Sequence, residues 1–138
     1  MKLQQSTLLG LYATLELVKA DGEQLSAADI ADKFDVSINH LAKVLRILVK
    51  ARLLRAARGA GGGYRFSGNV KRTTLMDVIE LFEPVSIEGF EHRDSPHHTD
   101  VEAGLAVALT EISEMMQATL RSITLRTMLK IIDGNGTV

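Results

Sequence analysis

The stretch RAARGAGGGYRF, residues 55–66, places four glycines within five positions and surrounds them with arginines. Glycines in this number either cradle a nucleotide phosphate or form the tip of a β-hairpin. A dinucleotide-binding fingerprint would need its third glycine at position 64, which is tyrosine here. A phosphate-binding loop would end in Gly-Lys-Ser or Gly-Lys-Thr, which this stretch lacks. Both motifs also continue directly into a helix. The following Tyr-Arg-Phe alternates like a strand instead. The stretch therefore predicts a β-hairpin with a basic tip.

Two short helices are predicted directly before the hairpin. Ser26 is a suitable cap for the first, and Ser37 for the second, which runs to about Ala51 after the turn Asp35-Val36. A helical hairpin with a polar outside would show the same pattern. Because the outer face of the second helix is basic and the hairpin follows at once, the order favours a winged helix-turn-helix.

The second helix and the hairpin carry the candidate DNA-binding residues. Polar side chains at the start of such a helix reach base edges in the major groove, and basic side chains further along meet phosphates. An arginine at the hairpin tip is placed for the minor groove, where the potential is strongly negative. The candidates are Ser37, Asn39, His40, Lys43, Arg46, Lys50, Arg58, Gly59, Tyr64 and Arg65.

The charge distribution also favours a polyanionic partner. Residues 1–72 contain 12 Lys or Arg and 6 Asp or Glu, whereas residues 73–138 contain 4 Lys or Arg and 11 Asp or Glu. The net charge of the whole chain, −1, does not reveal this asymmetry. From Lys43 to Arg72 there are nine basic residues and no acidic one. A solvated charged surface is the alternative, but this imbalance points to nucleic acid.

A long amphipathic helix is predicted at about residues 100–121, with Thr99 and Glu102 forming a capping box at its start. It follows a short helix near Thr74 and a polar loop. At 1.5 Å per residue the long helix spans roughly 30 Å, and a body of this size is too small to cover its whole apolar stripe. We expect the stripe to pair with a second copy of the chain, although packing within one chain is the alternative. The candidate dimerisation residues are Leu105, Leu109, Ile112, Met116 and Leu120.

The expected architecture is mainly α with a small β-hairpin wing: a winged helix-turn-helix plus a long C-terminal dimerisation helix. We assign residues 1–84 to the DNA-binding domain, 85–100 to a loop, and 101–138 to the dimerisation helix and C-terminal segment. Aromatic residues are only 4% of the 138, so the core is aliphatic, which suits helices. No apolar run reaches the roughly 18 residues of a membrane span. With no cysteine present, these features fit a cytoplasmic protein.

The loop at residues 85–100 holds the weak candidates for metal binding, His92, His97 and His98, near several carboxylates. Imidazole and carboxylate ligands suit Zn²⁺, Ni²⁺ or Fe²⁺. Adjacent histidines seldom converge on one ion, so a solvated loop is the competing interpretation. The scattered carboxylates and the absence of a nucleophile next to these histidines argue against an enzyme.

The chain resembles the Rrf-two (Rrf2) family of bacterial winged-helix transcription regulators. The resemblance covers nearly the whole chain and is most specific in RG-x-GGGY, Arg58 to Tyr64, placed after a helix ending in KA-x-LL. It implies a homodimer that binds palindromic double-stranded DNA operators and usually represses. It also implies a recognition helix that begins at Ser37, an Arg58 that enters the minor groove beside Gly59, and long helices that cross in the dimer.

The sequence departs from that family in one respect that bears on sensing. Many members hold an iron–sulfur cluster with three cysteines in the loop that corresponds to residues 85–100, and this chain has none. We therefore expect no iron–sulfur cluster and no other bound cofactor. The alternatives are a regulator that senses a metal ion or small ligand through the His/Asp loop, and a protein-interaction module that binds an acidic partner.

Overall fold

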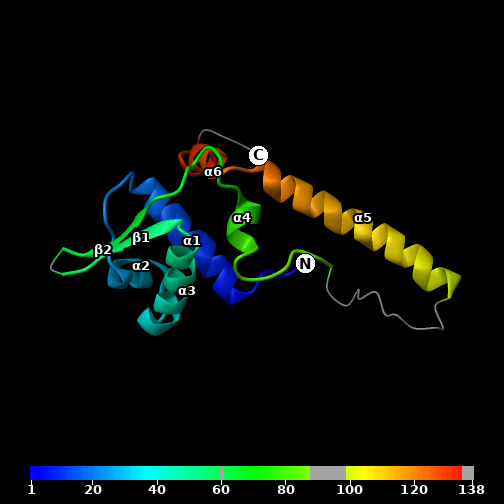
Figure 1. Cartoon of the computed structure of the whole chain (residues 1–138), viewed down its shortest axis with the longest axis horizontal. Coiled ribbons are helices and arrows are strands. Elements are labelled where there is room, and N and C mark those ends of the chain that lie inside the picture. The colour runs from blue at the N-terminus through cyan, green and yellow to red at the C-terminus, as the bar shows by residue number, and fades with distance from the viewer. Residues whose placement is uncertain (60, 88–98, 135–138) are drawn as a thin grey trace.

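The computed structural model describes residues 1–59, 61–87 and 99–134, and within them the predicted fold class is confirmed. A mostly helical body carries a two-stranded antiparallel hairpin, and one long helix extends away from it (Figure 1). In chain order the elements are α1 (Gln5–Lys19), α2 (Ala27–Phe34), α3 (Ile38–Lys50), β1 (Leu54–Ala57), β2 (Gly63–Phe66), α4 (Leu75–Ile79), α5 (Asp100–Ser122) and α6 (Leu125–Ile132).

Aliphatic side chains from α1, α2, α3, β1 and α4 form one core. Its fully buried members include Leu17 of α1, Ile30 of α2, Leu45 of α3 and Ile79 of α4. Each such side chain contributes about 1.5–3 kcal/mol of transfer free energy. The buried positions of α3 recur at spacings of three and four, so its other face remains free for contacts outside the body.

The helix starts agree with the sequence because capping is a local interaction. The hydroxyl oxygen of Ser26 accepts from the Asp29 N–H at 3.0 Å, and that of Ser37 accepts from the His40 N–H at 3.0 Å. Capping boxes begin α4 at Thr74 and α5 at Thr99. Each cap satisfies an N–H group that the helix itself leaves without a partner.

The hairpin is anchored to the segment between α1 and α2. Tyr64 of β2 exchanges two backbone hydrogen bonds with Leu25, at 2.8 and 3.0 Å. Gly63 makes this close approach feasible, because a Cβ there would lie 2.6 Å from the Leu25 carbonyl oxygen. Leu54 pairs with Phe66 on the core side of the hairpin. The wing is therefore fixed to the body along part of its length.

The chain after α5 returns to the body and forms α6, an element that the sequence analysis did not identify. The N–H of Leu75 donates to the Ile123 carbonyl at 2.9 Å, and the N–H of Leu125 donates to the Thr73 carbonyl at 2.9 Å. Ile123 has extended backbone and is buried, so it ends α5 rather than belonging to the exposed stripe of that helix. α6 then packs against α1 (Figure 1).

α5 contacts the body along its C-terminal half and projects beyond it (Figure 1). The N–H of Ile87 donates to the buried Ser113 hydroxyl at 3.2 Å, and the Gln117 side chain donates to the Val85 carbonyl at 2.8 Å. Apolar side chains on the projecting half are exposed to solvent, including Val101 and Val107. Several apolar side chains of this half are therefore left exposed in a single chain.

Candidate nucleic-acid interface

The outer face of α3 presents four of the predicted contact residues together. Asn39, Lys43, Arg46 and Lys50 are all exposed, and their spacings of four, three and four place them along one side of a helix. This side lies away from the buried residues of α3. Ile38, the first residue of α3, is also 52% exposed, although the sequence analysis did not single it out.

Two further candidates at the start of α3 already have structural partners. The Ser37 hydroxyl caps the helix, but it keeps its own proton for donation to a ligand. His40 is half-buried, and its ring Nε2 lies 3.2 Å from the hydroxyl oxygen of Ser6 in α1. His40 therefore helps to fix α3 against α1, whereas Ser37 remains exposed.

The hairpin tip has the conformation that its glycines predict. Gly59 and Gly61 have φ values of 93° and 78°, in the region that other residues rarely adopt. The Gly62 N–H donates to the Gly59 carbonyl at 2.9 Å, and a Cβ on Gly62 would lie 2.6 Å from the Ala57 carbonyl oxygen. Arg58 is exposed beside this turn.

The two remaining hairpin candidates lie on opposite faces. Tyr64 is half-buried and packs against the hydrophobic core. Arg65 is exposed, and its partner across the hairpin is the exposed Arg55. Arg55 was not among the predicted contact residues, although the alternation of the strand would have placed it on the outer face once the register was known.

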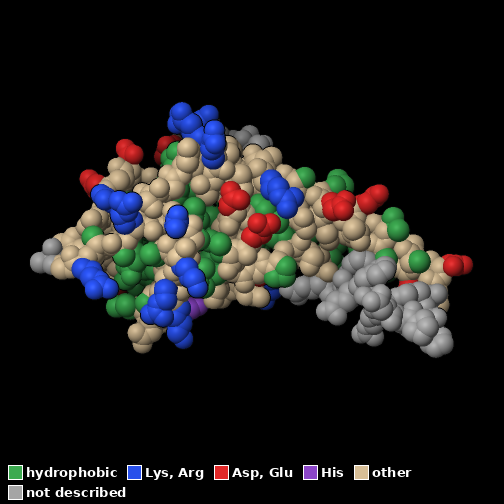
Figure 2. Space-filling view, in the orientation of Figure 1, with side chains coloured by type: hydrophobic (Ala, Val, Ile, Leu, Met, Phe, Trp, Pro, Cys, Tyr) green, Lys and Arg blue, Asp and Glu red, His purple; other side chains and the backbone are tan. Residues whose placement is uncertain are grey.

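Nothing acidic neutralises this surface within the described residues. Among the described residues, the ion pairs join Lys33 to Glu16 and Arg121 to Glu80. Neither pair involves any of the nine basic residues from Lys43 to Arg72. Figure 2 shows Lys and Arg side chains over the end of the molecule that holds α3 and the hairpin and also over α6, whereas acidic side chains lie along α5, in the middle of the molecule and near the loop between α1 and α2. Such a surface attracts phosphate groups, because its cations have no carboxylate to displace.

The five predicted dimerisation residues divide into two groups. Leu105 and Ile112 are 56% and 47% exposed, and Leu109 is half-buried. Met116 and Leu120, nearer the C-terminal end of α5, pack against the core of their own chain. Packing within one chain therefore covers part of the stripe and leaves the rest uncovered in the monomer.

The predicted metal ligands His92, His97 and His98 lie outside the described residues. Among the described residues, no three His, Cys, Asp or Glu side chains are grouped in a way that would hold a metal ion. No helix in the described part of the chain has both the length and the apolar character required to cross a membrane.

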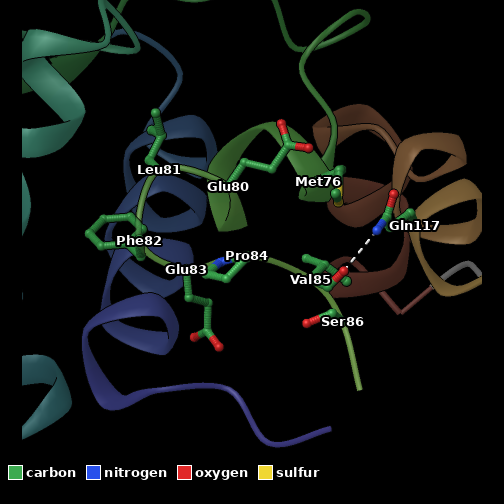
Figure 3. A pocket seen from close by; sticks show the side chains of 9 residues that line it. All are labelled: Met76, Glu80, Leu81, Phe82, Glu83, Pro84, Val85, Ser86 and Gln117. Atoms are coloured by element: carbon green, nitrogen blue, oxygen red, sulfur yellow. Dashed lines mark hydrogen bonds between the residues drawn. The ribbon is translucent and has the colours of Figure 1, made fainter. Parts of the chain in front are cut away.

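A cavity of about 700 Å³ lies between α4, residues 81–86 and α5 (Figure 3). At one side of it, the Gln117 side chain donates to the Val85 carbonyl. The carboxylate of Glu83 turns toward the start of α1, where it accepts hydrogen bonds from the Gln4 N–H at 2.7 Å and from the hydroxyl of Thr7. Glu83 is therefore engaged in joining two elements of the body.

Comparison with known proteins gives consistent results. Residues 3–131 match the Rrf2 family, described as iron-dependent transcriptional regulators. The chain is 52% identical over 133 residues to BadM of Rhodopseudomonas palustris, whose name places it among HTH-type transcriptional regulators; the match covers 96% of this chain and 84% of BadM.

Solved structures show the same fold. The chain superposes on T. potens IscR with a TM-score of 0.77 at 23% identity, over 100% of this chain and 93% of that one. It superposes on CymR, the global cysteine regulator of B. subtilis, with a TM-score of 0.75 at 26% identity, over 93% and 95% of the two chains.

Proposed function

This chain belongs to the Rrf2 family of transcription regulators, and from that premise we propose that it binds palindromic DNA operators as a homodimer and represses the adjacent genes. The observation that carries the proposal is the exposed basic surface of α3 and the hairpin, which has no acidic partner among the described residues. The family and the relatives are transcription regulators, in agreement with the expectation that the chain is not an enzyme.

Each part of the basic surface has a distinct role in this proposal. The start of α3 enters the major groove, where the Asn39 amide reads a base edge. Lys43, Arg46 and Lys50 meet the phosphates that flank the groove. Arg58 enters the adjacent minor groove from the hairpin tip, and the turn at Gly59 permits close approach to the backbone.

A second copy of the chain covers the exposed apolar side of α5 in the proposed dimer. Support comes from Leu105 and Ile112, which are exposed in the monomer and lie on the same side of the helix. Symmetric pairing of two such helices presents two recognition helices to two half-sites, which accounts for a palindromic operator. In this proposal residues 1–84 bind DNA, 85–100 form a loop, and 101–138 contain the dimer helix.

The proposed regulator works without a thiolate-bound iron–sulfur cluster. The family description refers to iron, but the chain contains no cysteine to ligate such a cluster. The donor set therefore does not fit that group, and no step in the proposed function depends on it. As a DNA-binding protein, the regulator would act in the cytoplasm.

A band-shift titration at two salt concentrations tests the proposal. We expect duplex DNA to bind with an affinity that falls steeply with salt, because bound phosphates release counterions. Arg58→Ala should weaken binding roughly tenfold, whereas Lys19→Ala, which removes an exposed cation outside α3 and the hairpin, should not. If the protein binds an acidic protein partner but no duplex at low salt, it is an interaction module instead.

A further inference from the structure

Arg52 has a backbone conformation that favours glycine. It follows the end of α3 with a φ of 64°. Its N–H donates to the Val49 carbonyl at 2.9 Å, and the next N–H, that of Leu53, donates to the Leu48 carbonyl at 3.1 Å. This pair of hydrogen bonds ends many helices, usually with glycine at the left-handed position because a Cβ is strained there. An arginine at this position lowers the stability of the fold, which suggests that its side chain has another role.

Arg52 lines a groove of about 700 Å³ between the end of α3 and β1, and it is exposed. Arg55 and Arg58 line the same groove, and no acidic residue does. Val49 forms its α3 side and follows Arg46 by three positions, so the groove borders the helix face assigned to DNA. Cations that share a groove repel one another, and a polyanion relieves that repulsion.

A second unfavourable feature lies beside the groove. Arg55 stands directly opposite Arg65 across the hairpin, and both are exposed. Like charges at directly opposed positions destabilise a strand pair. Neither arginine has an ion-pair partner in the described part of the chain. Both this pair and Arg52 reduce the stability of the free protein, and both add positive charge at the same place.

We propose that Arg52 and Arg55, in the groove that they share with Arg58, bind backbone phosphates of duplex DNA, and that they extend the contact made by α3 and the hairpin tip. This inference rests on the proposed DNA-binding function. Guanidinium groups also bind free phosphate, but the continuity of the groove with the basic face of α3 favours the DNA backbone. A contact of this kind strengthens binding to every duplex and does not depend on sequence.

Three substitutions at Arg52 test the assignment, with affinity for a duplex measured at several salt concentrations. Arg52→Gly removes the charge and relieves the backbone strain, so we expect a thermal midpoint about 3 °C higher and DNA affinity roughly tenfold weaker. The slope of log affinity against log salt should fall by about 2, since a dimer carries two copies of the groove. Arg52→Gln should weaken DNA binding as much as Arg52→Gly does, but it should not raise the thermal midpoint. Arg52→Lys should retain most of the salt dependence of the wild-type protein.

Arg126→Gln is the matched control, because it removes one exposed arginine from α6. If Arg52→Gly and Arg126→Gln bind DNA alike while Arg46→Gln binds weakly, the groove assignment is wrong and the proposed function stands. If the wild-type protein binds no duplex, both fail. If inorganic phosphate binds the wild-type protein but not Arg52→Gly, and DNA affinity is the same for both, the groove takes a free anion and not the DNA backbone.

Discussion

The hydroxyl of Thr7 donates a hydrogen bond to the buried carboxylate of Glu83, which lies 76 residues further along the chain. The same carboxylate accepts from the N–H of Gln4, just before α1. No side chain caps the start of α1; instead Glu83, which follows α4, accepts from the N–H of the residue before the helix and from a hydroxyl in its first turn. This contact joins the first helix to the segment that leads toward α5.

Thr7→Val should test the energetic importance of this contact. The change preserves the shape of the side chain and removes one hydrogen bond to a buried carboxylate, so we expect the free energy of unfolding to fall by about 2 kcal/mol. Thr14→Val is the control, since Thr14 is equally buried in α1 but donates to the neutral carbonyl of Gly10. Denaturant unfolding at fixed protein concentration measures both. Equal losses would show that the carboxylate contact has no special importance.

Gly63→Ala should detach the hairpin from the body. The new Cβ would lie 2.6 Å from the Leu25 carbonyl oxygen, so the backbone must move and the fold should lose about 2 kcal/mol. Hydrogen exchange should show loss of protection at the amides of Leu25 and Tyr64. Gly59→Ala strains the backbone but meets no neighbouring atom within 4 Å, so it should leave these two amides protected. Unchanged protection in Gly63→Ala would contradict the prediction.

Leu105→Asp should disrupt the proposed dimer. A charge on the exposed apolar side of α5 would be buried without a partner in the interface, so sedimentation should detect a monomer at micromolar concentration. Thr110→Asp is the control, because Thr110 follows Leu105 by five residues and therefore points about 140° away from it around the helix axis. A dimer that persists in Leu105→Asp would mean that another surface holds the two chains together.

Asn39→Ala and Lys43→Ala should separate base reading from phosphate binding. Loss of the Asn39 amide should weaken the free energy of binding to the preferred operator by about 1–3 kcal/mol and reduce discrimination between bases at one position. Loss of Lys43 should weaken binding to all duplexes similarly and lower the salt slope. Selection of binding sites from a random DNA library, repeated with each variant, distinguishes the two effects. Identical selected sequences from the wild type and Asn39→Ala would contradict base reading by Asn39.

Local interactions explain why much of the fold was predictable from the sequence. A cap such as Ser37 or Thr99 depends on residues three positions away, and the glycines at 59–63 require a turn wherever they occur. The hairpin, the capping box at Thr99 and the helix-turn-helix were therefore predicted close to their actual bounds. Which residues contact DNA stays a prediction.

Features that depend on distant partners were not predictable. α6 is short, and Leu125 is buried only because the chain returns to Thr73. The apolar stripe of α5 looks uniform in sequence, yet Met116 packs within its own chain while Leu105 does not. The left-handed backbone of Arg52 was missed for a similar reason, since nothing in an arginine signals that conformation.

The two backbone hydrogen bonds between Leu25 and Tyr64 have a consequence for operator choice. They hold β2 against the segment just before α2, so in the proposed complex the distance from the major-groove contact of α3 to the minor-groove contact of the wing should be the same on every half-site. An operator whose half-site is longer or shorter by one base pair must then be matched by twisting or stretching the duplex. The mechanical compliance of the DNA, and not that of the protein, would set which spacings are tolerated.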